Sequence, residues 1–319
     1  YSPYARENVH ALAAATRSIG IPSEVLPMVN EKDLEIARKL TNGQECFPAI
    51  CTTGTFVNKL MEPGADPGKM AFFMPDHNGP CRFGHYNKLH RIIFDRLGYE
   101  DAELITPSND DSYAALAPGK AGTRFRMNAW QGIVAIDMLK KMLQEKRPYE
   151  VTKGNTKKVY ESWLNEVIMS IENNCKGLAN ILEQAGESFS HIPVSNGQRK
   201  PIIAILGEVF MRDNPFCCGF IEEKLEALGA EVIQGPFAEW VIYSTIRYWR
   251  DSLWRGDLKG LFKSQVQQYA QKYVENKLRN TVSCHVELER EIPVKEMFKR
   301  TDPYVHHDYD GDPIATIGG

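Results

Sequence analysis

Residues 70–106 read MAFFMPDHNGPCRFGHYNKLHRIIFDRLGYEDAELIT, and this stretch decides the fold class. It opens with a continuous apolar run at 70–74, which is typical of a buried parallel strand. Apolar residues then recur at helical spacing from about Tyr86 to Leu97, and Gly98 ends the pattern. A second strand is predicted at 102–106. The order strand, helix, strand predicts parallel pairing through a crossover.

The same order returns in the second half of the chain. Residues 201–207, PIIAILG, predict a buried strand, followed by a helix at 219–228 and a strand at 231–233. Between the two units, helical patterns fill residues 125–144 and 156–185. We therefore expect an α/β fold with two Rossmann-like parallel-sheet lobes joined by a helical connector.

The domain boundaries follow from this reading. The first α/β lobe is expected at residues 1–120, the helical connector at 121–198 and the second α/β lobe at 199–319. A polar stretch with Pro193 and Gly197 marks the second boundary. Further elements are expected as helices at 6–19, 32–40, 46–61 and within 239–277, and as strands at 24–29 and 313–317. Because no closing element follows, the second lobe is expected to be incomplete at its C-terminus.

Composition narrows the class of protein. The chain has 319 residues, a formal net charge of -3 and scattered basic residues, which argues against a nucleic-acid or anionic-membrane surface. No apolar run is long enough to cross a bilayer, and the first residues do not resemble a signal peptide. The seven cysteines show no framework of a small secreted protein. We therefore expect a cytoplasmic protein with free thiols.

The first chemical feature is the segment Gly43-Gln44-Glu45-Cys46-Phe47-Pro48. Cys46 stands at the start of a predicted helix, and Pro48 suits the first turn of that helix. The free N–H groups and the positive end of the helix dipole stabilise a thiolate or a thiolate-ligated cluster. Cys46 is therefore a candidate metal ligand.

The second feature is Asn78-Gly79-Pro80-Cys81-Arg82-Phe83-Gly84, which follows the strand at 70–74. In open α/β sheets, ligands bind beyond the carboxyl ends of the strands. Cys46 and Cys81 are therefore expected at one sheet edge, where they could share an iron–sulfur cluster. Two buried, inert thiols are an equally open reading, because free cysteine is often a core residue.

The remaining cysteines are weighed in the same way. Cys217 and Cys218 follow a predicted strand, so one of them is a candidate third ligand, although adjacent residues seldom both reach one site. A redox-regulated role for this pair is a weaker alternative. Core or structural roles are favoured for Cys51, Cys175 and Cys284.

Other polar groups support no firm site. A solvated loop is favoured over a metal site for the segment His306 to Asp312, and surface salt bridges are at least as favoured as anion binding for Arg82, Arg124 and Arg126. Phosphate-binding and dinucleotide-binding glycine loops are absent, as is a nucleophile elbow. Hydrolase and nicotinamide dehydrogenase functions therefore have little support.

Several short segments of this sequence resemble those of one known family, namely the C-terminal region of the large CoA-substrate-specific enzyme activases. That family is related to the iron–sulfur cluster subunits of 2-hydroxyacyl-CoA dehydratases. The similar stretches extend across nearly the whole chain and keep their order. They are LTNGQECFP (40–48), FMP (73–75), GPCRFG (79–84), YNKL (86–89), AWQGIVA (129–135), RPYE (147–150), GEV (207–209), NPF (214–216) and YVH (304–306).

This resemblance implies a cubane (4Fe–4S) or double-cubane cluster held by three cysteines between Rossmann-like lobes, with Cys46 and Cys81 matching the first two. It also implies an ATPase activator protein or domain that supplies a low-potential electron, and an acyl-CoA-type substrate. The family's third cysteine, in a Cys-Met-Pro-Gly word, would fall beyond Gly319, and Cys217-Cys218 replaces a stretch that is usually polar. The ATPase motifs of the activase half are absent as well.

Two functions are therefore carried forward. The first is a low-potential electron-transfer or reductase module of anaerobic metabolism that works with an ATP-hydrolysing activator. The second is a cluster-free docking or scaffold module that binds an ATPase or dehydratase partner. Whether the chain is itself an enzyme, and whether it forms a homodimer, stay open at this point.

Overall fold

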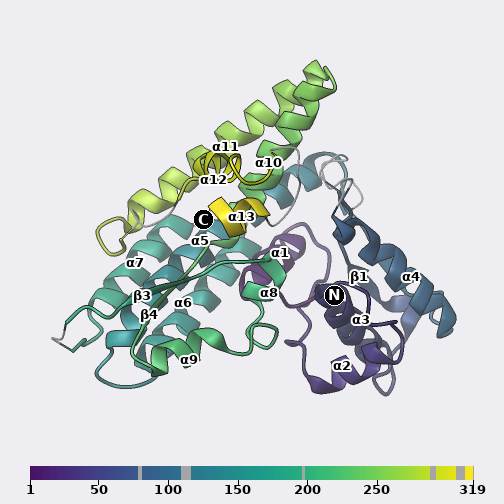
Figure 1. Ribbon diagram of the computed structural model, residues 1–319, viewed down its shortest axis with the longest axis horizontal. Coiled ribbons are helices and arrows are strands. Elements are labelled where there is room, and N and C mark those ends of the chain that lie inside the picture. The colour runs from purple at the N-terminus through teal and green to yellow at the C-terminus, as the bar shows by residue number, and fades with distance from the viewer. Residues whose placement is uncertain (78–80, 109–115, 196–197, 288–291, 307–312, 319) are drawn as a thin grey trace.

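The computed structural model describes residues 1–77, 81–108, 116–195, 198–287, 292–306 and 313–318. Helices dominate it, and two small parallel sheets lie among them (Figure 1). The helices are α1 (Asn8–Arg17), α2 (Glu31–Arg38), α3 (Phe47–Leu60), α4 (Tyr86–Arg96), α5 (Gly119–Lys146), α6 (Asn155–Glu172), α7 (Leu178–Ser190), α8 (Val209–Asp213), α9 (Ile221–Ala227), α10 (Phe237–Trp254), α11 (Leu258–Val282), α12 (Val294–Thr301) and α13 (Pro313–Gly318), with short 3-10 turns η1 (Pro67–Lys69), η2 (Arg82–His85) and η3 (Arg147–Tyr149).

Both predicted strand–helix–strand units are present. In the first, β1 (Ala71–Phe73) pairs in parallel with β2 (Glu103–Ile105), and α4 makes the crossover. In the second, β3 (Ile202–Ile205) pairs in parallel with β4 (Glu231–Gln234). Each sheet has two strands within the described residues. The α/β character is therefore confirmed in a reduced form, within a mainly helical protein.

Two expected strands are wrong. The segment 24–29 makes only an isolated bridge between Ser2 and Val25. The segment expected to be extended at 313–317 is helical in α13, because Ile314 is buried in a small core with Val294, Met297 and Phe298 of α12. A single strand without a sheet could not have buried this side chain.

The helix expected over 156–185 is interrupted. Asn174 and Cys175 have φ values of 57° and 58°, and Gly177 has a φ of 76°, so three left-handed residues separate α6 from α7. The break lets the two helices fold back against each other and against α5 (Figure 1). The sequence prediction missed it because Asn and Cys, unlike Pro, do not forbid a helix.

The main core surrounds α5. Its small residues pack against Ala11, Ala14 and Ala15 of α1, and its large apolar residues contact α6, α7, α10 and α11. A side chain at Gly132 of α5 would reach Cβ of Ala11 at 2.9 Å, so only glycine permits this close helix crossing. The opening helix of the chain therefore packs on the helical connector.

A second core holds the first α/β unit together. Phe56 of α3, Phe72 of β1 and Phe94 of α4 are fully buried, and their ring centroids lie 4.9 to 6.5 Å apart. Beside them His90 of α4 hydrogen-bonds through Nε2 to Oγ1 of Thr52 of α3 at 3.1 Å. Burial lowers the pKa of His90 to about 3, so it is a neutral hydrogen-bonding group at neutral pH. This packing fixes how the N-termini of α3 and α4 are oriented.

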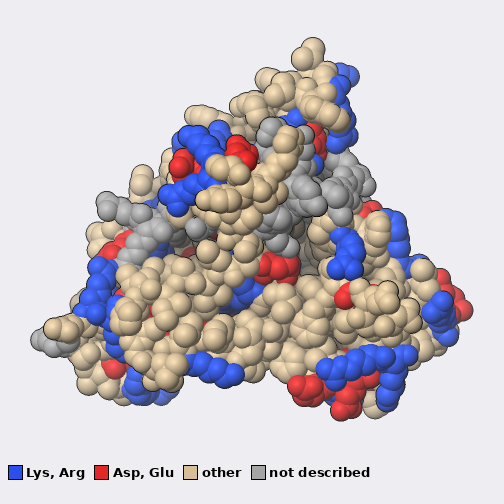
Figure 2. All heavy atoms as spheres, viewed as in Figure 1, with Lys and Arg blue, Asp and Glu red and all other residues tan. Residues whose placement is uncertain are grey.

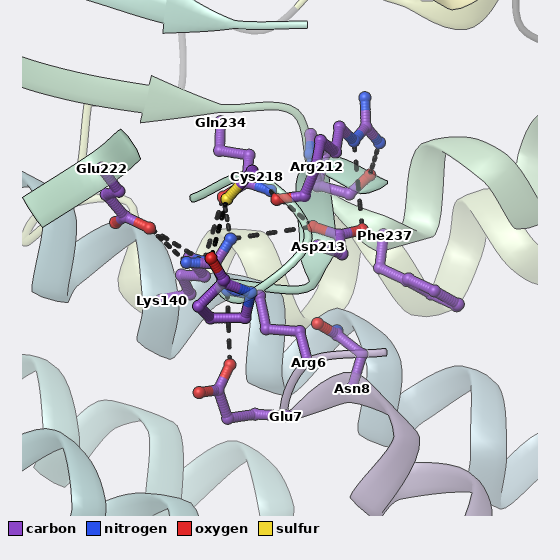
Figure 3. A network of polar contacts seen from close by, with 12 residues as sticks. Arg6, Glu7, Asn8, Lys140, Arg212, Asp213, Cys218, Glu222, Gln234 and Phe237 are labelled. Atoms are coloured by element: carbon purple, nitrogen blue, oxygen red, sulfur yellow. Dashed lines mark hydrogen bonds and ion pairs between the residues drawn. The ribbon is translucent and has the colours of Figure 1, made fainter. Parts of the chain in front are cut away.

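A buried ionic network joins the start of the chain to the second α/β unit (Figure 3). The guanidinium of Arg6 donates to Glu222 of α9 and to Gln234 of β4, and it lies 3.7 Å from Asp213 of α8. Arg147 donates to the same Glu222 at 2.8 Å. Because Arg6, Asp213 and Glu222 are almost fully buried, removing one of them would leave an unpaired charge in the interior.

Charge on the outside of the molecule is mixed. Acidic and basic side chains alternate over the face in Figure 2 without a large field of one sign, in keeping with the small net charge. None of the helices in the described part of the chain is both long enough and apolar enough to cross a membrane.

The crossing of α2 over α3 generates a stability prediction. A side chain at Gly54 of α3 would overlap the backbone carbonyl of Asp33 in α2. Gly54→Ala should therefore lower the free energy of unfolding by about 1–3 kcal/mol, although alanine is the better helix former. Urea unfolding measures this change.

The matched control is Glu35→Ala, at an exposed position of α2, which should change stability by less than about 0.5 kcal/mol. A Gly54→Ala protein as stable as the unaltered chain would contradict the close packing of α2 on α3.

Candidate functional site

A cavity of about 540 Å³ lies where the two α/β units meet. Such a volume lies within the range of ordinary ligand pockets, about 300–1,000 Å³. Its wall is mostly apolar and comes from the N-terminal segment, the start of α3, the end of β1, η2, α8, α10, α12 and α13. Cys46 and Cys81 both line it.

Cys46 stands where the sequence predicted it, at the N-cap of α3. Pro48 occupies the first turn of the helix, and Gly43 makes the preceding turn with a φ of 77°. The side chain of Cys46 is half-buried and makes no capping hydrogen bond. Its sulfur therefore lies at the positive end of a helix dipole, on the cavity wall.

Cys81 follows the carboxyl end of β1 and is the N-cap of η2, which leads directly into α4. Gly84 allows this placement, because a side chain there would overlap the backbone carbonyl of His77. Residues 78–80 of the same motif lie outside the described residues. Arg82 donates from Nη1 to the carbonyl of Gln44 at 3.0 Å and so ties the loop of Cys81 to the loop of Cys46.

Tyr86 lines the cavity with the two thiols and was not identified from the sequence. Its ring is nearly buried, and its hydroxyl hydrogen-bonds with Cys46. Burial raises the pKa of Tyr86, and the hydrogen bond to Cys46 and the nearby Glu208 and Cys81 raise it further. Tyr86 therefore stays protonated and can donate to a sulfur. Its position five residues after Cys81, on the first turn of the next helix, was the available signal.

Three more charged groups, Glu208, Arg212 and Glu239, line the cavity beside α8 and α10. Glu208 caps α8 by accepting from the N–H groups of Phe210 and Met211, at 3.1 and 2.8 Å. Arg212 lies 3.6 Å from Glu239 of α10, and both side chains are largely buried. The polar groups of the cavity are thus few and stand within apolar surroundings.

The candidate third ligands lie elsewhere. Cys217 has its sulfur 3.6 Å from that of Cys51, and Cys218 donates to the carbonyl of Pro215 at 3.5 Å. Neither belongs to the cavity wall. Cys51 is fully buried in the core, as expected, Cys175 contacts Asn128, and Cys284 is exposed.

The arginine and histidine side chains that the sequence offered as possible ligand contacts lie in different places. Arg124 and Arg126 are not part of the cavity wall, whereas Arg82 is. His306 is exposed, and residues 307–312 of the same segment lie outside the described residues. Within the residues that the structure describes, no group of three or more His, Cys, Asp or Glu side chains could hold a metal ion. The cysteine ligands that the cavity wall can provide for a metal are Cys46 and Cys81.

Comparison with known proteins adds no identification. No family model, no curated protein and no solved structure matches the chain. The resemblance to activases therefore depends only on the short sequence segments quoted above.

The sequence predicts that Cys46 and Cys81 share a metal ion, and both residues line one cavity. Titration with Cd²⁺ should produce the ultraviolet charge-transfer absorption of cadmium–thiolate bonds, because soft thiolates favour such ions. Cys46→Ser and Cys81→Ser should each lose most of this signal. The measurement is best made in a Cys51→Ala/Cys217→Ala background, which removes the other close pair.

Cys284→Ser is the control and should bind as the background protein does, because Cys284 is exposed and is not part of the cavity wall. An absorption that survives the loss of Cys46 or of Cys81 would show that the two thiols do not act together.

Proposed function

We propose that the chain is an iron–sulfur, low-potential electron-transfer or reductase module of the 2-hydroxyacyl-CoA dehydratase/activase type. In this proposal the two parallel units are Rossmann-like lobes in a cytoplasmic protein, and an ATP-hydrolysing activator is the partner. One observation carries it. Cys46 and Cys81, 35 positions apart in sequence, line the same cavity, each at the start of a helical segment.

The surroundings of the two sulfurs suit a negatively charged, thiolate-ligated group. The N-terminus of α3 and the turn that opens α4 present positive dipole ends, and Arg82 lies beside Cys81. Tyr86 can donate a hydrogen bond to sulfur, and such bonds tune the reduction potential of a cluster. When bound, a cluster would supply one-electron chemistry at low potential.

The two cysteines could supply some, but not all, of the ligands of such a cluster. Two thiols are available, and a cubane held by protein needs further ligands. In the proposal these come from outside the described residues, or from Cys217 or Cys218 after a local rearrangement. The apolar wall supports an acyl-type substrate, because an acyl chain needs a dry surface and few polar contacts.

Anaerobic reconstitution with iron and sulfide tests the proposal. The protein should gain the broad visible absorption of a cluster and, after reduction, an electron paramagnetic resonance signal. Cys46→Ser and Cys81→Ser should each lower bound iron severalfold, whereas Cys284→Ser should leave it unchanged. Tyr86→Phe should retain iron but shift the reduction potential downward, because it removes a donor to sulfur.

The proposal fails if anaerobic protein binds fewer than about one iron atom per chain, whether or not a segment following Gly319 is included. It also fails if the two cysteine variants bind as much iron as the unaltered chain.

A second candidate function, docking without a cluster, has its own observation. In α11 five large apolar side chains, namely Leu258, Phe262, Val266, Tyr269 and Tyr273, are 53–79% exposed. Spacings of three and four residues place them on one helix face. The hairpin of α10 and α11 projects from the body of the molecule (Figure 1), and the exposure of these side chains leaves the helix face open to a partner. Singly exposed apolar residues are ordinary, but a continuous stripe marks an interaction surface.

Positive charge beside the apolar stripe indicates what kind of partner surface would bind there. The exposed residues Lys259, Lys263 and Lys272 lie on either side of it, and residues 258–274 contain no Asp or Glu. The matching surface is therefore an acidic, amphipathic helix. We assign it to the ATPase activator, whose docking would use apolar contact for affinity and charge for steering.

Phe262→Asp and Tyr269→Asp should each weaken binding of a purified ATPase activator at least about tenfold, because they place a carboxylate within the apolar stripe. Binding should also weaken as salt increases. Isothermal titration calorimetry measures both effects. Met169→Asp on α6 is the matched control, since Met169 is 53% exposed on another surface.

If Met169→Asp weakens binding as much as the α11 variants do, the stripe is not the docking surface. Cys46→Ala and Cys81→Ala separate the two candidate functions. They should abolish iron binding under the first and leave activator binding unchanged under the second.

A further inference from the structure

Outside the cavity, two thiols from distant parts of the chain face each other. The sulfur of Cys51 in α3 lies 3.6 Å from the sulfur of Cys217, and 166 positions separate them in sequence. Cys217 follows α8, in the loop that leads to α9. Neither residue belongs to the cavity wall, so this pair is distinct from Cys46 and Cys81.

Both thiols lie in an apolar cluster. Cys51 is fully buried with Val29 and Leu34, and Cys217 packs against the cluster from the other side with Phe210 and Phe216. The carboxylate of Glu208 also acts on Cys217, and a negative charge disfavours a thiolate there. The contact of the pair is therefore one of thiol with thiol.

We propose that Cys51 and Cys217 are a redox modification site that closes to a disulfide bond under oxidising conditions. A disulfide has an S–S distance of about 2.05 Å, which a modest movement of either side chain can provide from the present separation. Cys217 is only half-buried, so a small oxidant can reach its sulfur.

The reaction balances with a disulfide oxidant such as oxidised glutathione. The Cys217 thiol loses its proton and attacks the oxidant, which releases one molecule of reduced glutathione and leaves a mixed disulfide. The Cys51 thiol then loses its proton and displaces the second glutathione. One S–S bond breaks and one forms, two electrons pass to glutathione, and its two thiols take up the two protons.

The hydrogen bond with Cys51 and burial both raise the pKa of Cys217.

Closure would link the two walls of the cavity. Cys51 lies five positions after Cys46 on α3, and Cys217 lies five positions after Arg212, which faces the cavity from α8. The bond would therefore hold α3 and α8 at a fixed separation. This inference does not depend on a cluster or on any substrate.

The test is incubation of the whole protein with oxidised glutathione, alkylation of the remaining thiols and mass spectrometry without reduction. We expect a linked pair of peptides that contains Cys51 and Cys217, a loss of two free thiols and a rise in Tm of at least about 4 °C that reductant reverses. Cys218→Ser should behave as the unaltered chain does. Cys217→Ala, at the half-buried position, should form no link and show no rise in Tm.

A link from Cys217 to Cys218 or to Cys46, or the absence of any link at equilibrium with oxidised glutathione, would overturn the proposal. The peptide analysis uses the unaltered chain, so it decides the matter even if a cysteine variant folds poorly. Iron binding is measured separately, so failure of this proposal and failure of the iron–sulfur proposal give different results.

Discussion

The arrangement of the whole molecule depends on the buried ion pairs of Arg6. This residue has a left-handed backbone, with a φ of 63°, and such a conformation costs about 1 kcal/mol for a residue other than glycine. The cost is offset because its guanidinium meets Glu222 and Gln234, more than 200 positions away. These bonds hold the segment before α1 against the second α/β unit. The apolar contact of Cys51 with Phe210 and Phe216 adds to them and helps to fix the walls of the cavity.

Local pattern and tertiary context explain what could be predicted of the fold. The strands at 71–73 and 103–105 and the helix between them were predictable, because a short apolar run and a 3.6-residue period are local signals. The helix α13 was not, since Ile314 is buried only by contacts with α12. β3 was predicted as buried, yet Ile202 is 43% exposed, and within the described residues β3 pairs with β4 alone.

Some residues of the candidate site could also be predicted from the sequence, and others could not. A cysteine before Pro at a helix start, and a second one beyond a strand, are visible in sequence, and both reached the cavity. Tyr86 and the pairing of Cys51 with Cys217 were not visible. The first depends on how α4 packs on α3, and the second on how the loop after α8 reaches α3. Contacts between segments so far apart have no periodic signature.

The broken helix between α6 and α7 has a consequence for how the protein holds together. Because α7 turns back onto α5, helices α5, α6 and α7 pack together before the chain reaches the second α/β unit. That unit is then bound by Arg6, Arg147 and Lys140 as much as by its covalent link. A protease cut between α7 and β3 would thus leave two fragments that remain one particle. An intact backbone between α7 and β3 is therefore not required to keep the two parts of the protein associated.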